Sequence, residues 1–246
     1  MKKYLHAFAM CQSMFCAIPC PWNIWDEDAR DQMLLFLPIV GIEIGALWAL
    51  LAWLAHLLNL PALVTGLILC AYPYAVTGCI HLDGFMDVTD ATRSCRSPER
   101  RREILKDPHV GSFAVIGVVL LILCQFALFA SAPQDANLLI LLFIPAVSRC
   151  CSALAVCALK PMTTSQYAGH TVPIAHIRIL EVLLCILVAL GFLTCSKYGF
   201  ALAGCLAGYS LALASAYKSL GGMNGDISGY ALTIGELCAA AVFALI

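Results

Sequence analysis

Residues 111–131 read GSFAVIGVVLLILCQFALFAS and contain no charged side chain. A helix that crosses the hydrocarbon core of a bilayer needs about 20 predominantly apolar residues. This stretch therefore predicts a membrane-spanning helix. The polar segment that precedes it, at 81–110, is predicted to lie at a membrane face.

Similar apolar windows recur along the chain, at 34–58, 62–80, 138–159, 178–195, 199–219 and 229–246. Of the 246 residues, 62% are hydrophobic and 12% are charged, whereas an ordinary soluble domain has about 45–50% apolar and about 25% charged residues. We therefore expect an all-α, polytopic integral membrane protein with about six to seven transmembrane helices. The connections between windows are short, so residues 1–246 are predicted to form a single domain.

The basic residues are distributed unevenly between the two sides of this predicted bundle. If the N-terminus is cytoplasmic, twelve of the fourteen Lys and Arg residues fall in cytoplasmic segments, whereas Lys197 is outside and Arg149 lies within a window. The positive-inside rule therefore predicts that the motif loops lie on the cytoplasmic face and the C-terminus outside. Residues 4–18 are interpreted as an interfacial or re-entrant helix, because no signal-peptide cleavage site follows them.

The fourteen cysteines do not predict a disulfide framework or a zinc site. None belongs to a C-x-x-C pair, and most lie inside apolar windows, where Cys behaves as a small hydrophobic residue. A metal or redox role for the Cys16 and Cys20 pair or for the adjacent Cys150 and Cys151 is the less favoured alternative.

The densest polar segment is 81–90, HLDGFMDVTD, which follows the second window. Asp83, Asp87 and Asp90 have the spacing i, i+4 and i+7, which places the three carboxylates on one helical face. A divalent cation would offset their mutual repulsion, and carboxylate oxygens suit Mg²⁺ or Mn²⁺. The alternative is a solvated acidic helix face. Gly84 would permit close approach of another backbone.

A basic stretch follows the acidic face, with side chains at Arg93, Arg96, Arg100, Arg101, Arg102 and Lys106. Arginine forks match phosphate oxygens, and phosphoryl transfer depends largely on such charge stabilisation. We predict phosphate binding by Arg93, Arg96 and Lys106. Setting the topology or contacting anionic lipid is the alternative for these bases.

Two glycine-containing segments adjoin the acidic face in the predicted topology. Gly111 begins the third window, and Gly222 and Gly225 frame Asp226 before the last one. Free backbone N–H groups at such positions bind anions. The alternative is helix capping in the segment before the third window and a simple glycine turn in the segment before the last one. Asp226 is predicted to join the metal site or to position a hydroxyl group, and His81 is a candidate proton carrier.

Ionisable residues inside apolar windows are expensive in hydrocarbon and are functional or paired by default. Glu43 lies between Gly41 and Gly45 in the first window. We expect it to pair with Arg149 or to face the site.

Several of these segments together resemble the cobalamin synthase (adenosylcobinamide-GDP ribazoletransferase) family. The segments are HLDGFMDVTD at 81–90, ILKDPHVGSF at 104–113, GGMNGD at 221–226, FCAIP at 15–19 and FLPIVGIEIG at 36–45. They follow the family's order and cover nearly the whole chain. The chain departs from the family's pattern at Met86, Val88, Ala91 and Asn224, whereas the carboxylates are intact.

The resemblance implies a Mg²⁺-dependent phosphotransferase of the bacterial inner membrane with a cytoplasmic active site. Such an enzyme transfers the cobinamide phosphate of adenosylcobinamide-GDP to α-ribazole or its 5′-phosphate and releases GMP, the last assembly step of cobalamin. Asp83, Asp87 and Asp90 would hold the metal, and Asp226 or His81 would accept the attacking proton. The substrates and the lipid bilayer are the expected partners, without nucleic acid. A homo-oligomer or a complex with other cobalamin-assembly enzymes is left open.

Two other functions fit parts of the pattern. A CDP-alcohol phosphatidyltransferase also uses an Asp-Gly motif, but its last aspartates are more widely spaced than Asp83, Asp87 and Asp90. A transporter would use Glu43, Glu181 and Glu236 along an ion path. Transporters usually show paired broken helices near the membrane centre, whereas the glycine-rich polar segments here lie at one face.

Overall fold

The computed structural model describes residues 2–22, 24–162, 165 and 172–246. In these ranges every regular element is helical, apart from an isolated β-bridge between Pro161 and Met223. The predicted all-α fold is therefore confirmed. The long helices are α3 Leu37–Leu57, α4 Ala62–Val76, α7 Ser112–Ala130, α8 Ile140–Ala158, α9 Ile174–Cys195, α10 Phe200–Leu220 and α11 Gly225–Leu245.

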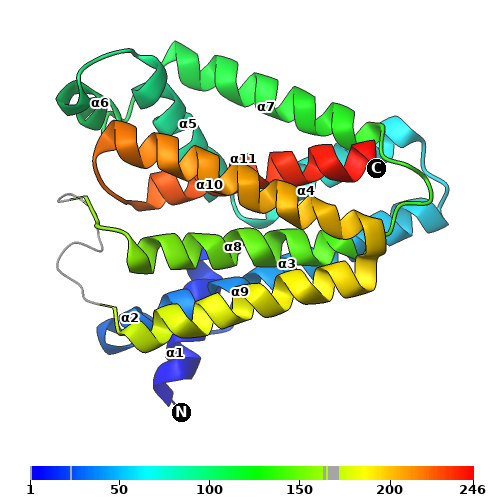
Figure 1. Cartoon of the computed structure of the whole chain (residues 1–246), viewed down its shortest axis with the longest axis horizontal. Helices are drawn as coiled ribbons and strands as arrows, with labels where there is room; N and C mark the ends of the chain where they lie inside the picture. Colours follow the sequence, from blue (N-terminus) through cyan, green and yellow to red (C-terminus); the bar gives the residue numbers. More distant parts are fainter. Residues whose placement is uncertain (1, 23, 163–164, 166–171) are drawn as a thin grey trace.

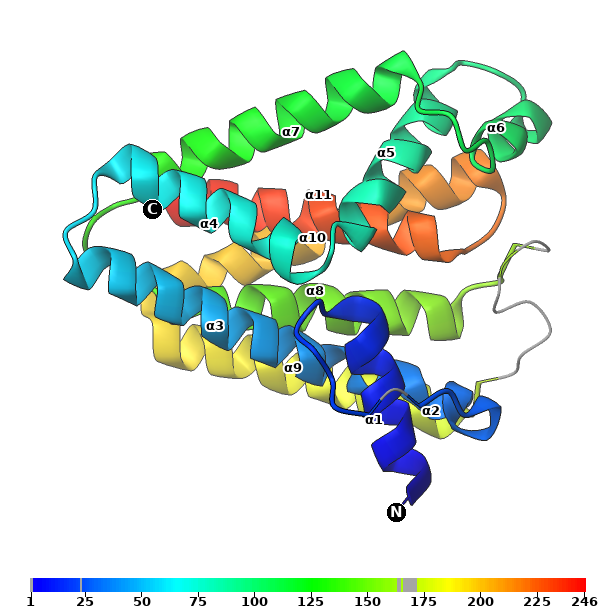
Figure 2. The ribbon, with the colours of Figure 1, turned by 180° about the vertical axis from the view of Figure 1, so that it is seen from behind.

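The shorter elements gather mainly around one end of the long helices (Figure 1). They are α1 Lys2–Phe15, α2 Arg30–Met33, α5 Ile80–Arg93 and α6 Pro98–Ile104, with 3₁₀ turns η1 Glu27–Ala29, η2 Leu34–Phe36 and η3 Ser196–Gly199. The expected N-terminal helix is thus present as α1. It runs across α3 rather than alongside it (Figure 2).

Five helical runs in the described ranges are long and apolar enough to cross a membrane, or six if the bent pair α4 and α5 counts as one span. One of these runs, 174–220, contains both α9 and α10. The chain turns back between them (Figures 1 and 2), and Ser196, with φ 54°, ends α9. Each of the seven predicted windows therefore coincides with a helix.

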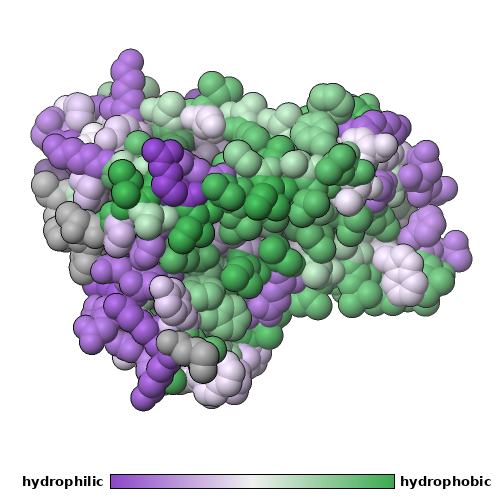
Figure 3. All heavy atoms as spheres, turned by 60° about the horizontal axis from the view of Figure 1, so that its bottom comes forward, coloured by the Kyte–Doolittle hydropathy of each residue, from purple (hydrophilic) through white to green (hydrophobic). Residues whose placement is uncertain are grey.

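A broad apolar surface runs along the bundle and is flanked by hydrophilic residues at both ends (Figure 3). The helices share this surface unequally. In the most apolar 18-residue window of each span, 83% of α8 is buried, compared with 22% of α7. The helix α8 is therefore the centre of the bundle, and α7 presents most of its surface to lipid.

Close helix contacts hold α8 in this central position. A Cβ atom at Gly41 would lie 2.8 Å from Ala146 Cα, and one at Gly45 would collide with the backbone of Leu142. Small residues at this spacing allow two membrane helices to approach closely. The FLPIVGIEIG segment thus packs the start of α3 directly against α8.

The buried charge of α8 is neutralised by α11. Arg149 Nη1 lies 2.8 Å from Glu236 Oε1, and Ser148 Oγ donates to the same oxygen over 2.7 Å. The predicted pairing of Arg149 with Glu43 is wrong, because Glu43 instead accepts a hydrogen bond from Gln12 Nε2 of α1 at 3.0 Å.

The second predicted window ends earlier than expected. The helix α4 stops at Val76, and α5 begins at Ile80 with its axis bent by 90°. The turn between them contains two left-handed residues, Gly78 with φ 58° and Cys79 with φ 62°. Such residues break a helix. As a result, α5 lies across the end of the bundle instead of continuing the span (Figure 2).

The elements rich in basic residues meet at one end of the bundle. This end contains α6, the start of α7 and the connection between α10 and α11, whereas the C-terminus lies at the opposite end (Figure 1). We call it the basic end. Its composition agrees with the charge asymmetry of the sequence.

Candidate active site

The helix α5 presents the predicted acidic face at the basic end. Residues 80–93 are helical throughout, so Asp83, Asp87 and Asp90 share one side of the helix as expected. Asp83 is exposed, and Asp87 and Asp90 are half-buried. The three carboxylates are therefore accessible from the membrane face.

Asp226 approaches this acidic face from α11. A Cβ atom at Gly84 would lie 2.9 Å from the Asp226 backbone oxygen, and one at Gly229 would lie 3.2 Å from His81 Cα. Glycine at these two positions allows the axes of α5 and α11 to come close. The structure thus brings Asp226 next to the 81–90 motif, as the predicted topology requires.

The segment that holds Asp226 is helical rather than a loop. Residues 220–228 were predicted to connect two spans, but α11 already begins at Gly225. Asn224 caps this helix, because its Oδ1 accepts a hydrogen bond from Ile227 N at 3.0 Å. Asn224 also donates to Asp226 Oδ2 at 2.7 Å. The departure from the family's pattern at Asn224 therefore supplies both a cap and a partner for Asp226.

The four carboxylates form a cluster of like charge. Burial, together with the negative charges of Asp83, Asp226 and Asp90, raises the pKa of Asp87 to about 6. The side-chain carboxylates of Asp83, Asp87 and Asp90 form no hydrogen bond or ion pair with any described residue. The cluster thus lacks a cationic partner within this part of the chain.

The donor chemistry of this cluster fits a hard divalent cation, since carboxylate oxygens are the ligands that Mg²⁺ prefers. The side chains are not, however, arranged around one point. Among the described residues, no three His, Cys, Asp or Glu side chains are placed so that they could hold a metal ion. A metal site here consequently rests on residue type and uncompensated charge, and Asp83, Asp87 and Asp90 remain its predicted ligands.

The position of the Asp90 carboxylate explains why residue 111 is a glycine. A Cβ atom at Gly111 would collide with both carboxylate oxygens of Asp90. Gly111 is the N-cap residue of α7, and the positive end of a helix dipole favours a carboxylate. Asp90 therefore lies where phosphate was predicted, and phosphate binding at Gly111 stays a prediction.

The basic stretch divides into paired and unpaired side chains. Arg100 pairs with Glu103 at 2.6 Å, and Arg102 pairs with Glu99 at 3.3 Å. Arg93, Arg96 and Lys106 are exposed, and their side chains form no hydrogen bond or ion pair with any described residue. The three bases predicted to bind phosphate are thus the ones left available for it.

Arg101 and Arg102 hold the connection between α10 and α11. Arg101 Nη1 donates to Ser219 Oγ at 2.6 Å, and Arg102 Nη1 donates to the Leu220 carbonyl at 3.2 Å. Sequence spacing does not predict this positioning role, because each arginine lies 118 residues from its partner.

The other side of this connection is held by main-chain hydrogen bonds. Met162 N donates to the Met223 carbonyl, and Met223 N donates to the Lys160 carbonyl, each at 2.9 Å. A Cβ atom at Gly222 would lie 2.9 Å from Met162 Cα, whereas Gly225 has open space around its Cα. Gly222 is therefore required for packing, and Gly225 is the glycine left open to a ligand.

His81 lines a cavity of about 150 Å³ between α1, α5, α8 and α11. Its Nε2 atom is buried without a hydrogen-bond partner, and its ring lies nearly parallel to that of Phe15, with centroids 6.0 Å apart. Burial and the positive charge of Arg149 lower the pKa of His81 to about 3. The imidazole is therefore neutral near neutral pH and is a weak proton acceptor.

A wider, open cavity of about 500 Å³ adjoins the first one and shares Met14 and Ile80 with it. Asp83 lines the open cavity, and Asp226 lines the closed one. The acidic cluster thus stands between two spaces of different character, one open and one partly enclosed.

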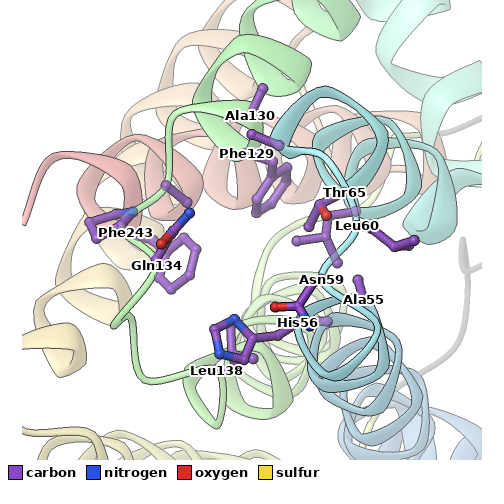
Figure 4. Close-up of a pocket in the computed structure, with 15 residues that line it drawn as sticks. Ala55, His56, Asn59, Leu60, Thr65, Phe129, Ala130, Gln134, Leu138 and Phe243 are labelled. Carbon is purple, nitrogen blue, oxygen red and sulfur yellow. The ribbon is translucent and has the colours of Figure 1, made fainter.

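A further cavity of about 220 Å³ lies at the opposite end of the bundle, where His56, Asn59, Thr65 and Gln134 surround it (Figure 4). Neither a carboxylate nor a Lys or Arg side chain lines it. It lacks the groups that phosphoryl transfer requires, so the candidate active site is at the basic end.

Comparisons with known proteins agree with this assignment. The family model described as cobalamin-5-phosphate synthase matches residues 7–244. A Clostridium botulinum protein named adenosylcobinamide-GDP ribazoletransferase is 36% identical over 247 residues, with 96% of each chain covered. A Clostridium perfringens protein of the same name is 35% identical, again with 96% of each chain covered. No solved structure matches the chain.

Proposed function

The chain belongs to the cobalamin-5-phosphate synthase family, and we propose that its basic end carries out the reaction after which its relatives are named. The enzyme joins adenosylcobinamide-GDP to ribazole, the final step of cobalamin assembly. The acceptor is α-ribazole or its 5′-phosphate. The basic end faces the cytoplasm, and the protein resides in a bacterial inner membrane.

The reaction is a phosphoryl transfer. A ribose hydroxyl oxygen of the acceptor attacks the phosphorus attached to cobinamide, and an O–P bond forms. The bond from this phosphorus to the bridging oxygen of the diphosphate breaks, and GMP leaves with the bonding electrons. The hydroxyl proton passes to the Asp226 carboxylate, which lies beside the acidic face and lines the cavity on that side.

The remaining residues bind and orient the donor. Arg93, Arg96 and Lys106 contact its phosphate oxygens, because they are exposed and unpaired. Asp83, Asp87 and Asp90 would hold Mg²⁺, which would offset negative charge on the diphosphate when bound. The uncompensated cluster of four aspartates is the observation that carries this proposal.

A transport function is less well supported. Glu236 is paired with Arg149, Glu181 with Arg178, and Glu43 accepts from Gln12. The acids considered for an ion path are therefore neutralised or bound by neighbours.

The test is GMP release by purified protein in detergent, given adenosylcobinamide-GDP, α-ribazole and Mg²⁺. We expect ribazole-dependent release by the wild type, no release after chelation of the metal, and a loss of about 10³-fold in Asp87→Asn. Asp107→Asn is the matched control, because Asp107 is an exposed aspartate at the same end whose side chain bonds only to His109 among described residues.

Release that does not depend on α-ribazole, or no release from a monodisperse wild type, would overturn the assignment. Equal losses in Asp87→Asn and Asp107→Asn would instead overturn the role given to the acidic face.

A further inference from the structure

The partly enclosed cavity beside Asp226 has walls of two chemical kinds. Apolar side chains from five elements line it, among them Phe15 of α1, Leu37 of α3 and Val156 of α8. Polar groups occupy the side toward α5 and α11, where His81 and Asp226 lie. Such a mixture of apolar surface with a few directed polar groups is typical of a small-molecule site.

Two residues that line this cavity, His81 and Ser152, each contain a buried polar atom without a hydrogen-bond partner of normal geometry. His81 Nε2 and Ser152 Oγ are buried and form no hydrogen bond of normal geometry, although Ser152 lies close to Tyr209. The Ser152 residue is only 1% exposed. A buried polar group without a partner costs about 1–3 kcal/mol. Since Tyr209 is a neighbour that can bond to Ser152, His81 Nε2 is the atom that indicates a ligand with a hydrogen-bond acceptor.

The size of the cavity restricts that ligand. Its volume is about 150 Å³, comparable with the volume of a protein cavity known to accept benzene, so it holds one aromatic ring, and a bicyclic base would extend out of its open side. The Phe15 and His81 rings, which both line it, lie nearly parallel at an angle of 10°. A planar aromatic group matches this shape better than a flexible chain or a phosphate does, and Phe15 belongs to the FCAIP segment for which the sequence assigned no role.

We propose that this cavity binds the heteroaromatic base of the ribazole acceptor, with His81 donating a hydrogen bond from Nε2 to the unsubstituted ring nitrogen of that base. The proposal rests on the proposed function. The base of ribazole is an apolar, bicyclic benzimidazole, whose ring nitrogen accepts such a bond from the neutral imidazole tautomer protonated on Nε2. With the base in the cavity, the ribose extends toward Asp226, where the hydroxyl reacts.

This arrangement makes His81 a specificity-determining residue rather than a proton carrier. It also separates the two substrates in space. The donor diphosphate approaches from the open cavity beside Asp83, and the acceptor base enters the closed one. Asp226 then lies where the two meet.

The test compares two acceptors in three proteins. The acceptors are α-ribazole and its indole analogue, in which the free ring nitrogen is replaced by CH. The proteins are the wild type, His81→Phe, which keeps a ring against Phe15 but removes the donor, and His109→Phe, the same substitution at an exposed histidine. The measured quantities are kcat/KM for each acceptor and KM for adenosylcobinamide-GDP, from GMP release.

We expect the wild type and His109→Phe to prefer α-ribazole over the indole analogue by about tenfold in kcat/KM, as the loss of one hydrogen bond predicts. His81→Phe should lose about tenfold toward α-ribazole, mainly in KM, and should no longer distinguish the two acceptors. The KM for adenosylcobinamide-GDP should be unchanged. Discrimination that persists in His81→Phe would overturn the inference.

A second variant protects the test against misfolding of the first. Val156→Phe places a ring in the cavity from the α8 side and should raise the KM for α-ribazole about tenfold while leaving the KM for the donor unchanged. An unchanged acceptor KM in this variant refutes the base site even if the wild type is fully active. A wild type without ribazole-dependent activity refutes the proposed function as well, so the two failures are distinguishable.

Discussion

The two concentrations of charge in this protein are balanced in opposite ways. In the centre of the bundle, Arg149 and Glu236 form a close pair whose side chains are 1% and 8% exposed, with Ser148 as a third member. At the basic end, four aspartates converge without a cation among the described residues. The charges of the first arrangement are neutralised within the chain, whereas those of the second require a cation from outside it.

This difference separates structural from functional charge. A buried pair of opposite charges can fix which helices meet, but it has no net charge with which to bind a substrate. A cluster of like charges destabilises the fold until a ligand neutralises it, and such strain is typical of active sites. Removing one charge should therefore have opposite effects on stability in the two regions.

The largest effect is expected in the central pair. Glu236→Leu leaves Arg149 buried without its partner and should lower the free energy of unfolding by about 3–5 kcal/mol. Thermal unfolding in detergent measures the loss. The control is Arg149→Met combined with Glu236→Leu, which should recover most of the stability because no unpaired charge remains. A double variant as unstable as the single one would contradict the assignment.

A smaller effect should accompany metal binding at the basic end. A cation that binds only the folded protein stabilises it by about 2.7 kcal/mol when its concentration is 100 times Kd. Adding Mg²⁺ should therefore raise the unfolding midpoint of the wild type and of Asp107→Asn but not of Asp87→Asn. Equal shifts in all three proteins would indicate a salt effect instead of a site.

Without metal, Asp87→Asn should be at least as stable as the wild type and up to about 1 kcal/mol more stable. The reason is that like charges one helical turn apart destabilise a helix by about 0.2–0.5 kcal/mol each, and Asp87 has several such neighbours. The measurement is unfolding in the presence of a chelator. If Asp87→Asn lowered the stability, as Glu236→Leu is expected to do, the two regions would not differ in how they balance charge.

The smallest effect should come from a pair that is satisfied but exposed. Arg178 and Glu181 lie 3.0 Å apart, with side chains 74% and 47% exposed. A double-mutant cycle with alanine at both positions should give a coupling of about 0.3–0.5 kcal/mol that decreases at high salt. A coupling energy as large as that of the central pair would mean that burial does not determine how much an ion pair contributes to stability.

Sequence patterns predicted the local features of this molecule well. The apolar windows coincide with helices, and the spacing of Asp83, Asp87 and Asp90 placed them on one face of α5 because both patterns depend on near neighbours. The basic residues predicted to bind phosphate are also the unpaired ones. What remained hidden were contacts between distant segments and the 90° bend after Val76.

These long-range features follow from packing that a single segment does not encode. Glu43 was predicted as a partner of Arg149 and is an equally plausible acid. In the structure, Gln12 of α1 donates a hydrogen bond to Glu43, and Arg149 pairs with Glu236 instead. Likewise, the Arg101 contact with Ser219 depends on how α6 meets the end of α10. Which of these side chains meet depends on how whole helices pack against one another.

The central pair also sets an order of events during synthesis. Arg149 precedes Glu236 by 87 residues. At bacterial elongation rates of about 5–20 residues per second, Glu236 is therefore synthesised roughly 4–17 s after Arg149. An arginine at the centre of a newly inserted helix costs about 2.5–3.5 kcal/mol. The arrival of the last helix from the ribosome removes that cost, so α8 should settle only after α11 is made, and a nascent chain that stops before Glu236 should be cleared by membrane proteases.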